Sequence, residues 1–298
     1  MNKMAVHNGV FHADDVFAVA FMKDIIENLE IIRTRDEEIL KTCDIVADVG
    51  GGKYDHHQAD KRLREDGIPY CAFGLLWEDF GESYVKKQFP NLTNEEQQKQ
   101  VVQNVAYEFI TQIDASDNGV DINTYEIPIT TISNVISSFM PFDAVGEEVD
   151  RAFFQAVDFA KEFFYKIVHK YVAYYDNMNY VQEQLEKQPI KESHILLLEK
   201  HVGWKDALLN LDKEEDVHFV VFQDITGSWR VQTVPRSVKS FESRYDLPKS
   251  WGGLRDEALT QETGISGCIF CHPSLFICGN ETKEGALAMA QKAISNEE

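Results

Sequence analysis

Short apolar runs alternate with longer amphipathic segments in the first half of the chain. The runs that predict strands lie at 4–7, 31–32 and 44–49. The segments that predict helices lie at 13–29, 72–89 and 94–113. Thr93 or Asn94 is expected to cap the last of these helices. Strands and helices that alternate at this spacing are typical of a parallel α/β sheet, whose ligands bind beyond the carboxyl ends of the strands.

The pattern changes in the second half of the chain. One helical stretch rich in Phe and Tyr, read as one long helix or two, covers 147–185, and a polar linker ending near Pro189 follows it. Beyond the linker, the expected elements are strands at 194–198, 217–222 and 229–234 and a final helix at 282–294. We therefore predict two domains, 1–185 and 191–298, the second being a smaller α/β domain.

Histidines and aspartates gather next to the ends of the predicted strands. Those of the first 57 residues are His7, His12, Asp14, Asp15, Asp48, Asp55, His56 and His57. Neutral imidazole and carboxylate are ligands that suit Mn²⁺, Zn²⁺, Fe²⁺ or Co²⁺. Converging carboxylates repel one another unless a cation lies between them. The segments therefore predict a site for two metal ions, which would share a bridging carboxylate and a hydroxide that attacks phosphorus.

Both segments also have a simpler interpretation. Asp14 and Asp15 could open a helix, where carboxylates interact favourably with the positive end of the helix dipole. The triplet Asp55-His56-His57 could form a solvated turn. The metal interpretation is favoured because the two segments carry the same ligand types and each follows a predicted strand.

A third acidic segment closes the apolar helical run that ends at Ile113. It carries Asp114 and Asp117 ahead of Asn118-Gly119, which by themselves read as a helix C-terminus. Asp114 is preferred as a metal ligand because it follows the apolar run directly, and Asp117 is the alternative.

Composition limits the partners and the compartment. The chain has 29 Lys and Arg against 50 Asp and Glu, a net charge of -21. Such a balance argues against a broad DNA-binding surface, because phosphate binding needs basic residues. It is compatible with a short oligonucleotide or nucleotide whose phosphates are held by metal ions. Five cysteines, no apolar run long enough to span a membrane and no apolar signal segment favour a cytoplasmic protein without membrane association.

Longer motifs carry a resemblance to a known family. They are His-Asn-Gly-x-Phe-His-x-Asp at 7–14, Asp-His-His-Gln at 55–58, Asp-Ala-x-Asp-Asn-Gly at 114–119, Trp-Arg-Val-Gln at 229–232, Leu-Pro-x-x-Trp-x-Gly-Leu-Arg at 247–255 and the segment 264–280. The first three resemble the DHH phosphoesterase superfamily, which includes RecJ exonucleases, nano-RNases and manganese-dependent pyrophosphatases. The whole set is most similar to the melanocyte-proliferating-gene family, also described as an uncharacterised or "metal-dependent protein hydrolase" family. Its eukaryotic members are regarded as RNA exonucleases.

The resemblance implies a DHH-like parallel-sheet domain, a smaller α/β domain and a site in the cleft between them. It implies metal ligands at His7, Asp14, Asp48, His56 and Asp114, with Asp48 as the bridge. His57 would face the substrate phosphate, and Asp55 would orient a neighbouring imidazole. His12 stands where the superfamily usually has an aspartate, and a neutral ligand there lowers the charge of the site. Two Mn²⁺ ions are expected, with Mg²⁺, Co²⁺ or Zn²⁺ as alternatives.

The resemblance also implies substrate contacts in the second domain. The superfamily grips its substrate with a Gly/His segment, which His272, Gly279 and Asn280 resemble. Arg230 and Arg255 are candidates to bind phosphate through their guanidinium groups, or are ordinary surface arginines.

A Cys-x-x-Cys-His motif at 268–272 has the spacing of c-type haem attachment. That interpretation is rejected because haem attachment belongs to exported proteins. Alternation in the motif instead predicts a buried strand in which cysteines act as small apolar residues. A zinc site is the alternative, with the ligands Cys268, Cys271, His272 and Cys278.

The leading prediction is a metal-dependent phosphodiesterase, an exonuclease that acts on short RNA or single-stranded DNA. The alternatives are hydrolysis of a dinucleotide, nucleotide or pyrophosphate, and a regulatory protein that binds metal without catalysis. Protein hydrolysis has no motif support, because neither a His-Glu-x-x-His helix nor a Gly-x-Ser-x-Gly elbow occurs. Cleavage polarity and oligomeric state, including a homodimer, are left open.

Overall fold

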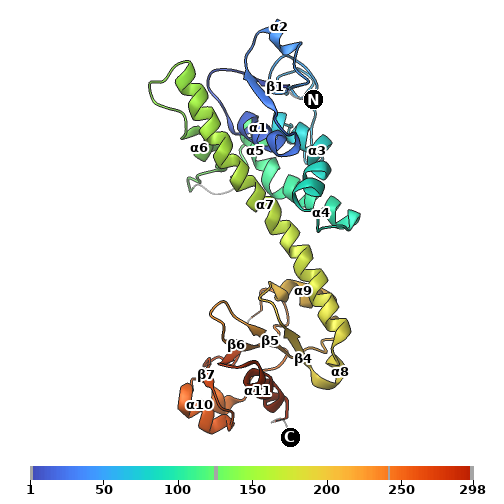
Figure 1. The fold of residues 1–298 in the computed structure, drawn as a ribbon, viewed down its shortest axis with the longest axis vertical. Coiled ribbons are helices and arrows are strands. Elements are labelled where there is room, and N and C mark those ends of the chain that lie inside the picture. Colours follow the sequence, from blue (N-terminus) through green and yellow to red (C-terminus); the bar gives the residue numbers. More distant parts are fainter. Residues whose placement is uncertain (1–2, 124–126, 241, 296–298) are drawn as a thin grey trace. The chain divides into compact units, whose positions relative to one another are not determined.

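Two compact units make up the chain, Met1–Ala173 and Tyr174–Glu298 (Figure 1). The structure is a computed structural model that describes residues 3–123, 127–240 and 242–295. Helix α7 (Glu147–Lys187) is one continuous helix through the stretch in which one or two helices were expected. The division between the units falls within this helix, ahead of the linker predicted near Pro189.

A three-stranded parallel sheet organises the N-terminal unit. Its strands are β1 (Lys3–Val6), β2 (Glu30–Arg33) and β3 (Ile45–Val46), in the order β2-β1-β3. This confirms the predicted parallel sheet. The third strand is shorter than its apolar run, because Ala47 forms an isolated bridge with Tyr54 and the next residue, Asp48, leaves the extended region with φ 58°.

Helices gather beside this sheet (Figure 1), and α1, α3 and α5 contact one another. The helical elements are α1 (Ala13–Ile25), α2 (Glu37–Leu40), α3 (Ala72–Gln88), α4 (Glu95–Val105), a π-helical turn (Ala106–Ile110), α5 (Thr111–Asp117) and α6 (Ile132–Ser137). Asn94, rather than Thr93, caps α4 by accepting hydrogen bonds from the backbone N–H groups of Glu96 and Gln97. All residues from Ala13 to Met22 are buried, as expected of a helix that is apolar on most of its faces.

An aromatic cluster forms the centre of this core. Phe164 of α7 has ring centroids between 5.3 and 6.2 Å from those of Phe17, Phe21, Phe73, Trp77, Tyr84 and Phe109. These rings come from α1, α3, α7 and the π-helical turn, so they pack α1, which carries two of the site residues described below, against the turn that precedes α5.

A mixed five-stranded sheet forms the C-terminal unit. Its strands are β4 (Ile195–Leu198), β5 (Phe219–Gln223), β6 (Trp229–Thr233), β7 (Cys268–Cys271) and β8 (Ile277–Asn280), in the order β4-β5-β6-β8-β7. Only β4 and β5 pair in parallel. The helical elements are α8 (Ile190–Ser193), α9 (Trp204–Leu211), a 3-10 turn (Lys249–Trp251), α10 (Asp256–Thr263) and α11 (Lys283–Ser295). The predicted α/β character of this part is confirmed.

The cysteines of this unit lie in its apolar core. Cys268, Cys271 and Cys278 are buried among Trp251, Met289 and other apolar side chains. The buried strand predicted over the Cys-x-x-Cys motif is therefore confirmed. Within the described residues, these cysteines and His272 do not form a group with the geometry of a metal site. No helix in the described ranges combines the length and the apolar character that a membrane crossing needs.

Candidate metal centre

Two neighbouring strands bring the first two site residues together. His7 follows β1 directly, and Asp48 follows β3 by two residues. Because β1 and β3 are parallel neighbours, their carboxyl ends meet at one edge of the sheet. The Nε2 atom of His7 lies 3.1 Å from Oδ2 of Asp48. The predicted meeting of the two strand ends is therefore observed.

Asp48 stands at the centre of the cluster. Its other oxygen, Oδ1, lies 3.1 Å from Nε2 of His56 and 3.4 Å from Nδ1 of His57. The residue has a left-handed φ of 58°, and its N–H donates to the carbonyl of Tyr54 at 2.9 Å. A non-glycine residue in this conformation costs of the order of 1 kcal/mol and is held by its surroundings. The backbone thus fixes a carboxylate whose two oxygens face two different sets of imidazoles.

Asp15 joins the cluster, although the sequence placed it in the His/Asp segments without naming it as a ligand. Its Oδ1 accepts a hydrogen bond from the backbone N–H of His12 at 2.8 Å, which caps the start of α1. Its Oδ2 lies 3.5 Å from Nε2 of His7. Possible ligand atoms of His7, Asp15 and Asp48 all lie within 4.8 Å of one another. One carboxylate therefore caps the helix and also faces the site.

A second group of ligand types lies on the other side of His56. The possible ligand atoms of His12, Asp14 and Asp117 lie within 4.8 Å of one another. Nε2 of His56 lies 2.9 Å from Oδ2 of Asp117 and 3.7 Å from Oδ2 of Asp14. His12, the departure from the superfamily pattern, is thus placed among the candidate ligands.

The structure favours Asp117 over Asp114, which corrects the preferred choice made from the sequence. Asp114 is fully buried, pairs with Arg64, and accepts a hydrogen bond from the N–H of Cys71 at 2.9 Å. Gly74 makes room for it, since a Cβ there would lie 2.4 Å from Oδ1 of Asp114. Asp114 therefore anchors the start of α3, while Asp117, one turn later, faces His56. The apolar run could not reveal this, because the choice depends on where Arg64 lies.

Several carboxylate oxygens of the site are buried and have no hydrogen-bond partner among the residues that the structure describes. Asp14 is 0 % exposed, and neither of its oxygens has a hydrogen-bond partner. Burial, followed by the charges of Asp48 and Asp117, raises the pKa of Asp14 well above its usual range. Burial also raises the pKa of Asp15 to about 7. Buried carboxylates in this state are stabilised by a cation, so the donor set fits divalent metal ions.

The histidine rings of the site also direct nitrogen atoms toward these carboxylates. Nδ1 of His7 lies 3.2 Å from the carbonyl oxygen of Asn8, which can only accept, so Nδ1 carries the proton. In the neutral ring, the lone pair on Nε2 then faces Asp48 and Asp15.

Burial opposes the charged form of His56, but hydrogen bonds to Asp117 and Asp48 raise its pKa to about 10. Conversely, hydrogen bonds from His56 and His7 outweigh burial and lower the pKa of Asp48 to about 2. Without a metal ion, a proton on His56 balances part of the negative charge.

Asp55 holds the ring of His57 in a fixed orientation. Its Oδ1 lies 2.9 Å from Nδ1 of His57 and accepts the backbone N–H of the same residue at 3.0 Å. Its Oδ2 accepts the N–H of Gly51 at 2.7 Å. The side chain of His57 is 64 % exposed, so its other nitrogen is open to a substrate.

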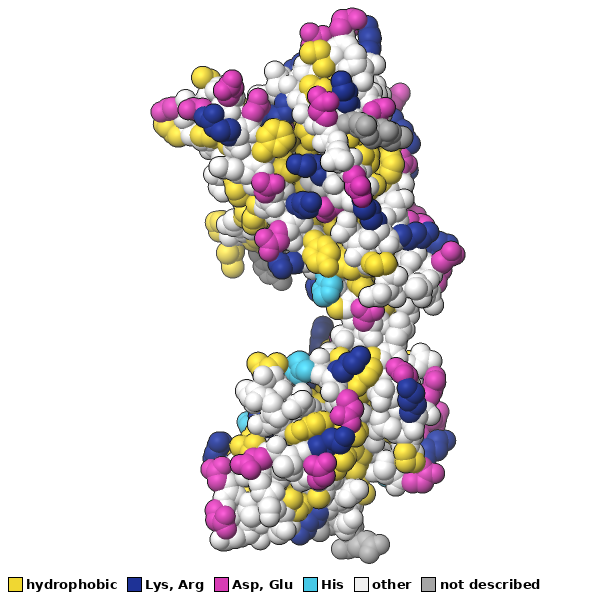
Figure 2. Space-filling view, viewed as in Figure 1, with side chains coloured by type: hydrophobic (Ala, Val, Ile, Leu, Met, Phe, Trp, Pro, Cys, Tyr) yellow, Lys and Arg dark blue, Asp and Glu magenta, His cyan; other side chains and the backbone are white. Residues whose placement is uncertain are grey.

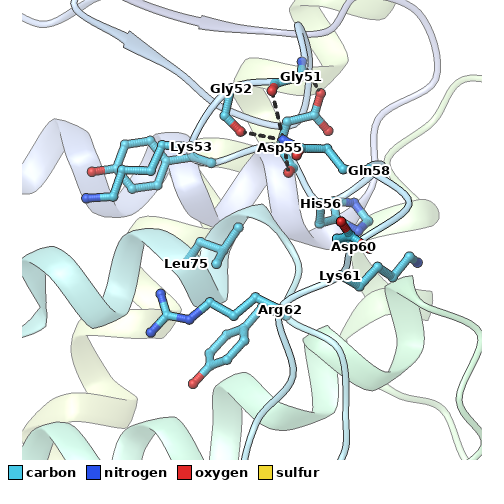
Figure 3. A pocket seen from close by; sticks show the side chains of 12 residues that line it. Gly51, Gly52, Lys53, Asp55, His56, Gln58, Asp60, Lys61, Arg62 and Leu75 are labelled. Carbon is cyan, nitrogen blue, oxygen red and sulfur yellow. Dashed lines mark hydrogen bonds between the residues drawn. The ribbon is translucent and has the colours of Figure 1, made fainter.

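Two cavities adjoin the cluster. The larger has a volume of about 500 Å³ and shares Asp55 and His56 with the cluster (Figure 3). The smaller, of about 280 Å³, is lined by His12 and Asp117 together with the small polar residues Ser116, Ser133, Asn134 and Ser137. The larger cavity also contains three cationic side chains, Lys53, Lys61 and Arg62, which the motifs did not identify.

The predicted substrate residues of the C-terminal unit have partners of their own. Asn280 is fully buried, donates to the carbonyl of Ser266 at 2.9 Å and accepts the N–H of Thr282 at 2.9 Å. Arg230 pairs with Asp224 and lies against Gly279, at which a Cβ would approach Nη1 of Arg230 to 2.6 Å.

His272 and Arg255 are less deeply placed. Nδ1 of His272 accepts the N–H of Ser274 at 3.0 Å, and Arg255 precedes α10 with its guanidinium 5.9 Å from the ring centroid of Phe270. Substrate contact by any of the five predicted residues, and a shared cleft, stay predictions.

Comparison with known proteins gives matches over nearly the whole chain. The profile described as "Uncharacterised protein family (UPF0160)", MYG1_exonuc, matches residues 3–294. The chain is 35% identical to "MYG1 exonuclease" of Rattus norvegicus, covering 98% of this chain and 84% of the rat protein. It is 34% identical to "MYG1 exonuclease" of Homo sapiens, over 98% and 86% of the two chains. It is 33% identical to "MYG1 protein C694.04c" of Schizosaccharomyces pombe, over 98% and 97%. No solved structure gave a significant match.

Proposed function

The chain belongs to the family described as Uncharacterised protein family (UPF0160), and on this premise we propose that it is a metal-dependent phosphodiesterase. Its substrate would be a short RNA or single-stranded DNA, cleaved from one end. The names of the mammalian relatives support a nuclease-like hydrolase. The His/Asp groups of the N-terminal unit, which could hold metal ions, support this proposal.

One observation carries the proposal: buried carboxylates without partners converge around a shared one. Asp14 has two buried oxygens that lack hydrogen bonds, and Asp15 has one. Asp48 takes part in two groups of possible ligands, one with His7 and Asp15 and one with His56 and His57. A carboxylate shared in this way is what a pair of adjacent metal ions requires.

Divalent ions, when bound, would supply Lewis-acid activation of water and neutralise charge on the phosphate. The residues that would hold them are His7, His12, Asp14, Asp15, Asp48, His56 and Asp117. His57 is exposed beside this group and is oriented by Asp55, so it can donate a hydrogen bond to a phosphate oxygen or a proton to the leaving group. Mn²⁺ suits the mixed imidazole and carboxylate set.

The net charge of -21 is compatible with a nucleic acid substrate that the protein holds only at one end of the strand. Figure 2 shows Lys and Arg side chains interspersed with Asp and Glu on the visible face of the N-terminal unit, so this face has no uniformly acidic surface. An enzyme that holds a few terminal nucleotides needs basic residues only near the reacting phosphate. Lys53, Lys61 and Arg62 line the cavity that His56 borders.

Substitution of the shared carboxylate tests the proposal. Asn tolerates the left-handed backbone of Asp48, so Asp48→Asn removes the charge and keeps the local conformation. With Mn²⁺ and short oligonucleotides, the unmodified chain should release mononucleotides, and Asp48→Asn should reduce release by about a thousandfold or more. Asp143→Asn, an exposed position outside the cluster, is the matched control and should keep full activity.

Metal analysis and substrate length separate the alternatives. Two ions bound per chain, falling in Asp48→Asn, would agree with the proposal. Intact oligonucleotides after long incubation with Mn²⁺, despite bound metal, would reject it in favour of a non-catalytic metal protein. Rates on dinucleotides that greatly exceed rates on 20-mers would favour a small-molecule phosphohydrolase.

A further inference from the structure

The cavity beside His56 contains three cations with different surroundings. Lys53 pairs with Asp79, and Arg62 pairs with Glu78. Lys61 instead donates to the amide oxygen Oδ1 of Asn118 at 2.6 Å, and it forms no ion pair with a carboxylate among the residues that the structure describes. The positive charge of Lys61 is therefore the least compensated of the three. In a chain with an excess of acidic residues, such a lysine beside the candidate metal centre is available to an anionic ligand.

Asn118 holds Lys61 in place and is itself fixed. Its Nδ2 donates to the carbonyl of Pro69 at 3.0 Å and to the carbonyl of Asp114 at 2.9 Å. These bonds leave Oδ1 for Lys61. Asn118 follows Asp117, whose carboxylate lies 2.9 Å from His56. The same helix end therefore places a candidate metal ligand and a lysine next to each other.

A close view of the cavity shows how its charged side chains lie. Figure 3 shows Lys61 beside Asp60 and His56, while Arg62 extends in the opposite direction. Asp60 also lines the cavity and lowers its positive potential. A volume of about 500 Å³ is sufficient for a nucleotide unit. The cavity thus combines space, one uncompensated cation and a direct border with the candidate metal centre.

We infer that this cavity is a subsite for a second phosphate of the substrate, the one next to the scissile phosphodiester, with Lys61 as its cation and Asn118 as a positioning residue. The inference rests on the proposed function and adds a requirement to it. Substrates with two neighbouring phosphates bind better than substrates with one. Lysine acts here as a point charge on a phosphate, which is its usual role in phosphate sites.

Two dinucleotides that differ by one phosphate test the subsite. ApA has only the scissile phosphate, and pApA has a second one at its 5′ end. With Mn²⁺, we expect pApA to have about tenfold higher kcat/KM, mainly through a lower KM. Lys61→Gln should remove this difference by raising the KM for pApA about tenfold. Lys61→Arg should retain most of it, and Asp60→Asn should increase it by about twofold because it removes an opposing charge.

Lys86→Gln is the matched control. Lys86 is an exposed lysine of α3 that lies 3.7 Å from Glu82, and it does not line the cavity. Its substitution should alter neither dinucleotide. Equal effects of Lys61→Gln on both dinucleotides, or no effect on either, would overturn the subsite while leaving the proposed function intact.

Failure of the proposed function has a different signature, namely that neither dinucleotide is cleaved by the unmodified chain. Calorimetric binding with Mn²⁺ then decides the subsite. Tighter binding of pApA than of ApA, lost in Lys61→Gln, supports it. Equal binding of the two dinucleotides rejects it.

Discussion

The N-terminal centre and the C-terminal segment 264–280 both bury polar residues near the ends of strands, but they differ in how these residues are hydrogen-bonded. In the centre, Asp14 is 0 % exposed and its two oxygens have no hydrogen-bond partner. In the segment, Asn280 is also 0 % exposed, but its amide donates to Ser266 and accepts from Thr282. A buried polar group without a partner costs free energy unless a ligand compensates it. The comparison favours the first region as a ligand site, while substrate contact in the second stays a prediction.

The basic residues of the two regions differ in the same way. Arg230 pairs with Asp224 across a turn, whereas Lys61 donates to the neutral amide of Asn118 and has no carboxylate partner in the described parts of the chain. The residue types that suggested a substrate grip in the C-terminal unit are thus largely used within the protein. Lys61, which lines the cavity that His56 borders, is available to a substrate phosphate. Substitutions in each region can break or sharpen this contrast.

The largest effect is expected at Asp14. Asp14→Asn should lower Mn²⁺-dependent hydrolysis roughly a thousandfold, because several kcal/mol of charge stabilisation is lost. In the metal-free protein, burial and the charges of Asp48 and Asp117 oppose the ionisation of Asp14, which costs free energy of folding at neutral pH, and the same change removes this cost. It should therefore raise the free energy of unfolding by about 1 kcal/mol and Tm by roughly 2–4 °C. Calorimetry with and without Mn²⁺, together with single-turnover rates, measures both effects.

Asp143→Asn serves again as the control and should change neither quantity. A loss of metal-free stability in Asp14→Asn would contradict the contrast, since it would mean that the carboxylate is satisfied within the protein. Unchanged hydrolysis would remove Asp14 from the site.

The sequence predicted the parts of the centre that follow from strand topology. Ligand types after β1 and β3 had to meet, because the carboxyl ends of parallel neighbours share one edge of the sheet. His7 and Asp48 accordingly lie 3.1 Å apart. Most strands and helices were also predicted, because their apolar periodicity reflects burial. The strand β8 was missed, since Ile277–Asn280 contains a glycine and an asparagine that lower strand propensity.

The remaining features depend on side-chain packing that no periodicity encodes. Asp15 was in the predicted His/Asp segments but was not named as a ligand, and the structure shows that its second oxygen faces His7. Asp114 and Asp117 are three residues apart on one helix, so either could face the site until Arg64 is placed. The role of Lys61 depends on a contact with Asn118 that spans 57 residues of sequence.

A smaller effect separates the two aspartates of α5. Asp117→Asn should weaken Mn²⁺ binding by about ten- to a hundredfold, because one carboxylate beside His56 is lost. Asp114→Asn should leave the metal affinity of the folded protein unchanged and lower the free energy of unfolding by about 3 kcal/mol, because Arg64 loses its buried partner. Metal titration and urea unfolding of the two variants form a matched pair. The reverse pattern would restore Asp114 as the ligand.

The smallest effect is expected at Asn280, which tests whether the C-terminal segment 264–280 supports the fold or binds substrate. Asn280→Ala removes the hydrogen bonds to Ser266 and Thr282 and leaves space beside Gly285, at which a Cβ would approach Oδ1 of Asn280 to 2.2 Å. The free energy of unfolding should fall by about 2 kcal/mol in urea titrations. Asn210→Ala, at an exposed amide that contacts Tyr174, should change it by less than about 0.5 kcal/mol.

Activity measured on folded Asn280→Ala distinguishes support from substrate binding. An asparagine that only holds the start of α11 leaves kcat/KM for oligonucleotides close to that of the unmodified chain, because its amide is not available to a ligand. An asparagine that grips the substrate gives the opposite result, a raised KM with little loss of stability. That result would show that the hydrogen bonds of Asn280 are exchanged for substrate contacts. A buried amide whose hydrogen bonds are all made would then indicate a binding residue, just as a buried carboxylate without hydrogen bonds does.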